Sequence, residues 1–130
     1  MVCANPDKVV QRGDKMIYCA GALADLYVEL GGKVFMAGKP YAPIYAMARE
    51  AAERCAGRPI ETARILAVGD GLPTDVLGAN AQGLDLLFIA AGIHAREVQD
   101  ESGKLDPERA MAFLRRADAH ARYALDELCW

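Results

Sequence analysis

The run from Ile65 to Asp75, Ile-Leu-Ala-Val-Gly-Asp-Gly-Leu-Pro-Thr-Asp, constrains the fold of this chain more than any other stretch. Its first four residues are apolar and predict a buried strand of a parallel sheet, because such strands are covered on both faces. A glycine-rich turn follows, and Thr74 and Asp75 are placed to open the next helix. Two carboxylates thus follow a buried strand, at the edge where open α/β sheets bind ligands. Because buried acids are commonly neutralised by a divalent cation, the run indicates magnesium and phosphate.

Strand and helix patterns alternate along most of the sequence, which predicts an α/β fold with a parallel sheet flanked by helices. We expect further strands at residues 1–4, 34–36, 86–90 and 123–128, and helices at 19–30, 43–56, 74–82 and 106–119. The polar region from Arg96 to Leu105 is predicted to be a mobile loop. Two helices carry apolar stripes that we expect to face the core: Ala22, Leu23, Leu26, Tyr27 and Leu30 in the first, and Ile44, Met47, Ala48, Ala51 and Cys55 in the second.

Composition narrows the class of protein. The 130 residues suffice for one compact domain at most, and 53% of them are hydrophobic. A net charge of −3 argues against nucleic-acid binding, which needs a basic face. No stretch approaches the roughly 20 apolar residues that span a bilayer, and the amino terminus does not resemble a signal peptide. The four cysteines lack zinc-ligand spacing, so we expect free thiols in a reducing cytoplasm.

Three segments in order resemble motifs of one enzyme family. The segment from Val68 to Asp75 resembles the fourth motif of the haloacid-dehalogenase-like (HAD) phosphohydrolases, and Gly38-Lys39-Pro40 resembles the third. The segment from Val2 to Asp7 resembles the end of a strand in the mixed α/β cap of the nitrophenylphosphatase-like branch, subfamily IIA. The resemblance covers nearly the whole chain. It implies that residues 1–36 end the cap domain and that residues 37–130 form the carboxyl-terminal half of a Rossmann-like core.

The resemblance also implies roles for individual residues. Asp70 would be a magnesium ligand, Lys39 would stabilise the charge of the phosphoryl group, and Asp75 would hold a metal-bound water or the amides of the loop. Asn5 and Asp7 would touch the leaving group of the substrate from the cap side.

Ordinary structural roles remain open for the same residues. Asp75 can simply cap the helix that follows it, and Lys39 can be a solvated lysine before a helix. Asn5-Pro6-Asp7 is also common turn chemistry. His94 lies at the mouth of the expected crevice, where a structural role is the more common one for a single histidine.

The family's nucleophile lies in an Asp-x-Asp motif, and no two aspartates of this sequence are separated by one residue. The chain therefore resembles the carboxyl-terminal part of a phosphatase that forms an aspartyl-phosphate, and we expect it to be inactive alone. Its expected partners are a small phosphorylated metabolite and either further copies of itself or a missing amino-terminal segment. A half-sheet would leave an unpaired edge beside residues 65–68, together with uncovered apolar faces.

Two other functions remain as alternatives. The chain can be a non-catalytic module that keeps the fold and an anion or metal site for binding or assembly. It can also be a dinucleotide-binding Rossmann domain, although Thr74 stands where the third glycine of the Gly69-x-Gly71 fingerprint belongs. A phosphate-binding loop at Gly38-Lys39 is excluded, because Pro40 replaces the required Ser or Thr.

Overall fold

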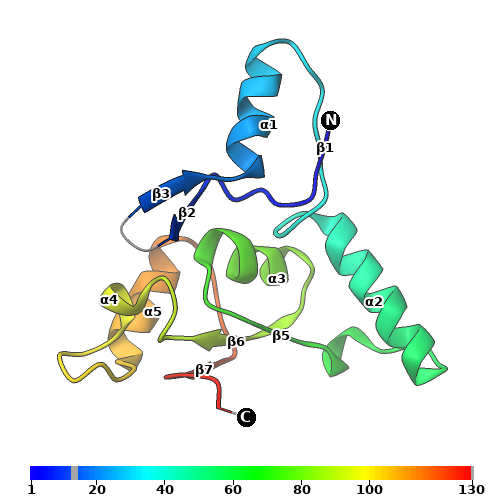
Figure 1. Cartoon of the computed structure of the whole chain (residues 1–130). Helices are drawn as coiled ribbons and strands as arrows, with labels where there is room; N and C mark the ends of the chain where they lie inside the picture. Colours follow the sequence, from blue (N-terminus) through cyan, green and yellow to red (C-terminus); the bar gives the residue numbers. More distant parts are fainter. Residues whose placement is uncertain (13–14, 130) are drawn as a thin grey trace. The chain divides into compact units, whose positions relative to one another are not determined.

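The computed structural model describes residues 1–12 and 15–129. The chain divides into two compact units, Met1–Ala51 and Ala52–Trp130. The helix α2 (Ala42–Ala56) runs across the boundary between them (Figure 1). The predicted boundary between cap and core, after residue 36, stays a prediction.

The first unit contains two small sheets and the helix α1 (Ala20–Glu29). Strand β1 (Val2–Cys3) pairs in parallel with β4 (Phe35–Met36). Strands β2 (Val9–Arg12) and β3 (Lys15–Tyr18) form an antiparallel pair, in a stretch for which the sequence patterns gave no prediction. Helix α1 lies against β1 and β3 (Figure 1). The predicted strands at 1–4 and 34–36 and the helix at 19–30 are thus present in this unit.

Helix α1 does not pack through the apolar stripe predicted for it. Its leucines Leu23 and Leu26 are exposed, and its buried residues are Gly21 and Ala24. The cause is close backbone packing, because a methyl group on Gly21 would overlap the carbonyl oxygen of Pro6. Only small residues allow two backbones to approach so closely. The helix therefore packs through its small residues, and its leucines face away from the rest of the unit.

Helix α2 ends as predicted but is not buried as predicted. Gly57 follows it with φ of 64°, the left-handed conformation that ends helices at a glycine. None of its residues is buried, so the expectation that its apolar stripe faces a core is wrong for the residues described. Periodicity identifies an apolar face, but it does not supply the surface that would cover it.

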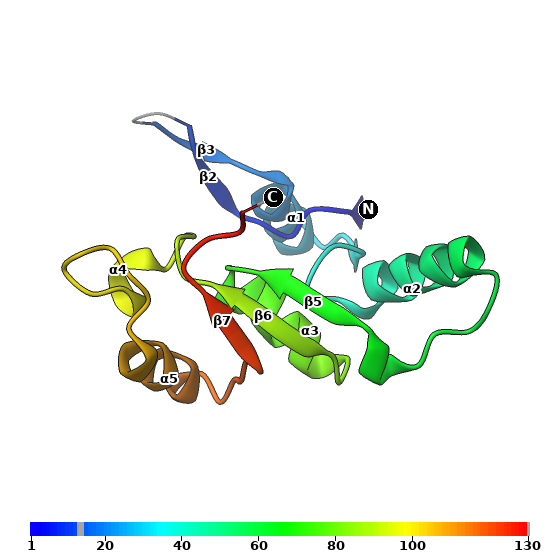
Figure 2. The ribbon, with the colours of Figure 1, turned by 90° about the horizontal axis from the view of Figure 1, so that it is seen from below.

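The second unit is built on a three-stranded parallel sheet, in the order β5 (Leu66–Gly69), β6 (Asp85–Ile89), β7 (Tyr123–Leu125) (Figures 1 and 2). This arrangement confirms the predicted α/β class with a parallel sheet flanked by helices. The elements between and before the strands are a 3-10 turn at Thr62–Arg64, a π-helical turn η2 at Leu72–Val76, and the helices α3 (Leu77–Ala81), α4 (Ala95–Val98) and α5 (Pro107–Arg116).

The two faces of this sheet differ in burial. Leu86 and Phe88 of β6 point into the core, which is completed by residues of η2 and the helices: Val76, Ala79, Val98, Ala110, Phe113 and Leu114, with Ala90 and Ala119. The strand register places Leu66, Val68, Tyr123 and Leu125 on the opposite face. No helix of this unit covers that face in Figure 2.

The expectation that residues 65–68 are buried on both sides is therefore wrong for the described chain. Leu66 is 45% exposed and Val68 is 46% exposed. Within the described residues, β5 pairs with β6 alone, so its other edge is unpaired, as the half-sheet interpretation predicted.

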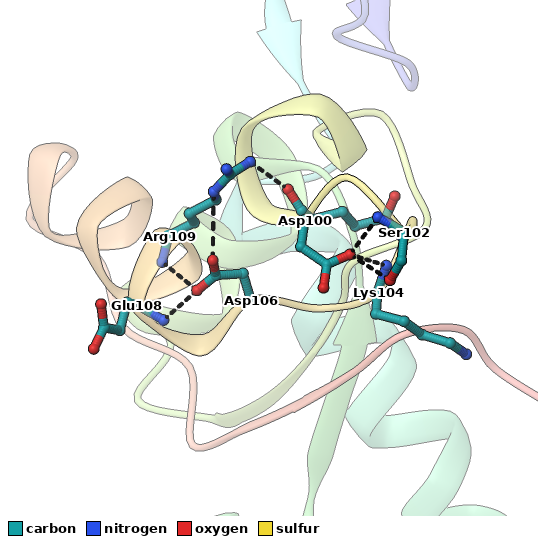
Figure 3. A network of polar contacts seen from close by, with 7 residues as sticks. Asp100, Ser102, Lys104, Asp106, Glu108 and Arg109 are labelled. Carbon is teal, nitrogen blue, oxygen red and sulfur yellow. Dashed lines mark hydrogen bonds and ion pairs between the residues drawn. The ribbon is translucent and has the colours of Figure 1, made fainter.

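The region from Arg96 to Leu105 contains more regular structure than the loop predicted for it, and its mobility stays a prediction. It contains α4 and an antiparallel bridge between Gln99 and Leu105. Oδ1 of Asp100 accepts hydrogen bonds from the Ser102 amide (2.8 Å), the Ser102 hydroxyl (2.7 Å) and the Lys104 amide (3.0 Å) (Figure 3). The hydrogen bond from the Ser102 hydroxyl is the largest of the effects that lower the pKa of Asp100 from its ordinary value. A polar sequence here encodes a tight turn.

Helix α5 begins at Pro107, within one residue of the start of the helix predicted over 106–119. The side chain of Asp106 accepts hydrogen bonds from the amides of Glu108 (2.9 Å) and Arg109 (3.1 Å), as an N-cap residue does (Figure 3). Arg109 then donates to the carbonyl oxygen of Gln99 at 2.7 Å. The cap therefore also ties the helix to the turn that precedes it.

Candidate active site

The loop after β5 is organised around the carboxylate of Asp75, which is only 9% exposed. Its Oδ2 atom accepts hydrogen bonds from the amides of Asp70 (3.2 Å) and Gly71 (3.0 Å). In return, the Asp75 amide donates to the carbonyl oxygen of Gly71 at 2.8 Å. A methyl group on Gly69 would overlap this carboxylate, so the strand must end in a residue without a side chain. Asp75 thus binds amides of its own loop, and its part in catalysis stays a prediction.

Asp70 is half-buried at the carboxyl end of β5, with one carboxylate oxygen engaged. Its Oδ2 atom accepts a hydrogen bond from the amide of Ile93 at 2.8 Å. Its Oδ1 atom has no hydrogen-bond partner within residues 1–12 and 15–129. The backbone after β6 approaches so closely that a methyl group on Gly92 would overlap Asp70. The carboxylate is therefore oriented by one oxygen and able to bind a ligand with the other.

The Oδ1 oxygen of Asp70 suits magnesium, but it supplies only one of the ligands that the ion needs. Magnesium commonly takes one or two carboxylates and completes its shell with water and phosphate oxygens, so Asp70 suits one position. In the part of the chain that the structure describes, no group of three or more His, Cys, Asp or Glu side chains could hold a metal. The loop can thus contribute to a magnesium site but does not enclose one.

His94 also contacts this loop. Its Nε2 atom accepts a hydrogen bond from the amide of Leu72 at 3.2 Å. Of these contacts, the amide of Ile93 is the one that the sequence reasoning missed, whereas His94 was expected at the mouth of the crevice without an assigned partner. The available signal was their position directly after a strand that neighbours β5.

The other expected site residues lie in the first unit. Because β1 and β4 are parallel, the segments that follow them begin at the same edge, and the Ala37 amide donates to the carbonyl oxygen of Cys3 at 2.8 Å. Gly38 is buried against the backbone of Ala4, which a methyl group on residue 38 would overlap. The structure thus brings Gly38-Lys39-Pro40 beside the segment that carries Asn5 and Asp7.

The contacts of Asn5 are those of a turn. Its Oδ1 atom accepts a hydrogen bond from the amide of Asp7 at 3.0 Å, which is the side-chain-to-backbone bond of an Asx turn. Asn5, Asp7 and Lys39 are all exposed. Their substrate and phosphoryl roles stay predictions. They lie in a different unit from Asp70 and Asp75.

A family model described as HAD-hydrolase-like matches residues 36–115. The chain belongs to this HAD-like hydrolase family. The predicted family is thereby confirmed. No curated protein matches the chain. None of the helices in the described residues is long and apolar enough to cross a membrane.

Solved structures agree with the family. A haloacid-dehalogenase-like hydrolase from Brucella suis 1330 is 43% identical, with a TM-score of 0.70 over 98% of this chain and 44% of that chain. A possible sugar phosphatase of the HAD superfamily from Cytophaga hutchinsonii is 22% identical (TM-score 0.69, 97% of this chain and 40% of that chain). The p-nitrophenyl phosphatase from Archaeoglobus fulgidus is 21% identical (TM-score 0.63, 95% and 41%). The latter two show a shared fold, and this HAD-like chain spans less than half the length of all three.

Proposed function

We propose that this HAD-like chain is part of a magnesium-dependent phosphohydrolase that cleaves phosphate monoesters of small metabolites through an aspartyl-phosphate. The observation that carries the proposal is the loop after β5. There Asp75 holds two consecutive amides, and Asp70 is oriented through one oxygen while the other has no partner in the described residues. Family membership and the phosphatases among the structural neighbours support it.

In this proposal Asp70 holds the metal and Lys39 neutralises the phosphoryl group. A bound magnesium ion would supply Lewis-acid stabilisation of the charge on the phosphoryl oxygens. Phosphoryl transfer depends mainly on positioned positive charge, which is what an exposed lysine after β4 can offer a substrate. Removing one such electrostatic contact typically raises a barrier by about 3–4 kcal/mol. Asn5 and Asp7, beside Lys39 in the same unit, would meet the leaving group.

The nucleophile is proposed to come from a polypeptide segment outside these 130 residues. No Asp-x-Asp motif is present, and the carboxylate of Asp75 is engaged with amides of its own loop. If no such segment exists, a non-catalytic binding module becomes the favoured function. We place the protein in the cytoplasm, because its four cysteines are free thiols.

We also propose that the unpaired edge of β5 and the open face of its sheet are covered by association. Leu66, Val68, Tyr123 and Leu125 lie on that face and are exposed. Contiguous exposed apolar surface and a free strand edge both favour pairing with another polypeptide. The partner is either a second copy of this chain or an amino-terminal segment of the HAD-like core.

We expect the 130-residue chain to form dimers or larger species in solution, with amide protons of β5 protected from exchange. Multi-angle light scattering and hydrogen exchange measure the two effects. Replacing Val68 by Lys should shift the population towards monomer, while the matched exposed change Met47→Lys in α2 should not. A stable 14.0 kDa monomer with rapidly exchanging β5 amides would contradict association through this edge.

Magnesium binding is expected to be weak and centred on Asp70. Titration with magnesium should shift the backbone amide signals of residues 69–72, 74, 75 and 93, and the amide of residue 93 contacts the carboxylate. Asp70→Asn should abolish these shifts. The control Asp118→Asn changes the same charge at an exposed residue whose φ of 51° asparagine tolerates, and it should leave the titration unchanged. Shifts that cluster elsewhere, or that persist in Asp70→Asn, would refute the assignment.

A further inference from the structure

The segment after β6 holds the loop after β5 by two hydrogen bonds of opposite direction. The amide of Ile93 donates to Oδ2 of Asp70 at 2.8 Å. One residue later, Nε2 of His94 accepts from the amide of Leu72 at 3.2 Å. The first bond orients the carboxylate itself. The second fixes the backbone two residues beyond it.

His94 is itself held in place by neighbours from two helices. Its side chain is only 19% exposed, and its ring centroid lies 4.7 Å from that of Phe113 in α5. Its Nδ1 atom lies 3.7 Å from Oε1 of Glu97 in α4. Because Nε2 accepts a hydrogen bond from an amide, the proton of the neutral ring is on Nδ1, on the side of the Glu97 carboxylate. The carboxylate favours this tautomer, so the acceptor stays directed at Leu72.

With this contact, three consecutive amides of the loop are bound by side chains. Asp75 holds those of Asp70 and Gly71, and His94 holds that of Leu72. A loop with three consecutive amides restrained in this way has fewer conformations to lose when a ligand binds Asp70. We propose that His94 is a positioning residue, which presents the Asp70 carboxylate to a divalent cation by fixing the loop backbone. The proposal rests on the proposed function, because it takes Asp70 as the metal ligand.

Two variants separate the acceptor of His94 from its packing. His94→Gln keeps an acceptor at about the position of Nε2, whereas His94→Phe keeps an aromatic ring against Phe113 and removes the acceptor. In the full 130-residue chain, we expect His94→Phe to speed exchange of the Leu72 amide by about 3–10-fold and to weaken binding of magnesium alone by a similar factor. It should also shift the Asp70 carboxyl carbon signal measured without metal. His94→Gln should stay near wild type in all three readouts.

The same measurements can overturn the proposal. If His94 serves only packing, His94→Gln will lose more stability than His94→Phe, and neither will change the Leu72 exchange rate or the Asp70 signal selectively. That result overturns the positioning role. If the wild-type chain binds no magnesium at Asp70, the proposed function fails and the metal-directed role of His94 fails with it. If wild type binds magnesium but His94→Phe binds it equally well, the proposed function stands and the inference about His94 is wrong.

Discussion

The 130-residue chain is expected to hydrolyse p-nitrophenyl phosphate with magnesium at a rate several orders of magnitude below that of a complete phosphatase of this family. Electrostatic groups lower the barrier of phosphoryl transfer only when an attacking oxygen is held in line with phosphorus. The sequence has no Asp-x-Asp motif to supply that oxygen, and Asp75 is engaged with loop amides. Water can attack directly, but without a positioned acid–base partner the reaction loses typically 10²–10⁴-fold from that effect alone.

Supplying the nucleophile-bearing segment that we propose should restore turnover. A suitable donor is the Brucella suis hydrolase, of which this chain covers 44%, fused through the part of its chain that lies outside the match. Steady-state assays of the chain alone, the donor part alone and the fusion separate the contributions. Robust magnesium-dependent turnover by the isolated chain would mean that another residue is the nucleophile, and the division of roles proposed here would be wrong.

Among single changes near the loop after β5, we expect Gly92→Ala to cause the largest loss of stability and of magnesium binding. A methyl group at residue 92 would overlap both Cβ and Oδ2 of Asp70, so either the strand ends or the loop must move apart. Forced overpacking of this kind commonly lowers the free energy of unfolding by about 1–3 kcal/mol. We also expect magnesium binding at Asp70 to weaken by about tenfold or more, because displacement of the carboxylate disturbs its bond to Ile93.

Gly57→Ala is the matched control for this change. Gly57 has φ of 64° and open space around the position of a Cβ atom, so alanine there meets backbone strain of about 1–2 kcal/mol and no clash. Urea denaturation and magnesium titration of both variants test the difference. Equal losses of stability, with magnesium binding unchanged in Gly92→Ala, would show that the approach of residue 92 to Asp70 has no role in the site.

Features that depend on local chemistry were predictable from the sequence. The glycines Gly57 and Gly83 end helices with positive φ, and Asp106 caps α5 through its own side chain. The strand and glycine turn that lead to Asp70 could be read directly, because residue types near in sequence determine them. The contact of Asp75 with its own loop was also predictable, since the amides that it binds are only four and five residues away.

Features that depend on distant partners were not predictable in the same way. The apolar stripes of α1 and α2 were recognised, but periodicity does not tell whether another surface covers them. The hydrogen bond from Ile93 to Asp70 spans 23 residues. Its donor is a backbone amide, which every residue except proline has, so the residue type at position 93 could not reveal it. His94 bonds through its side chain, so its residue type could be recognised in the sequence. Its partner Leu72 is 22 residues away, however, and could not be identified without the register of β5 and β6.

The central proposal is that Lys39 and Asp70 both serve phosphoryl transfer, and a double-mutant cycle in the fusion protein tests it most directly. Lys39→Ala and Asp70→Asn are each expected to lower kcat/KM for p-nitrophenyl phosphate by about 10²–10³-fold. Because groups that act as a unit are strongly non-additive, the double variant should lose far less than the product of the two single losses. Two single losses that multiply in full, or an unchanged kcat/KM in either single variant, would contradict this proposal.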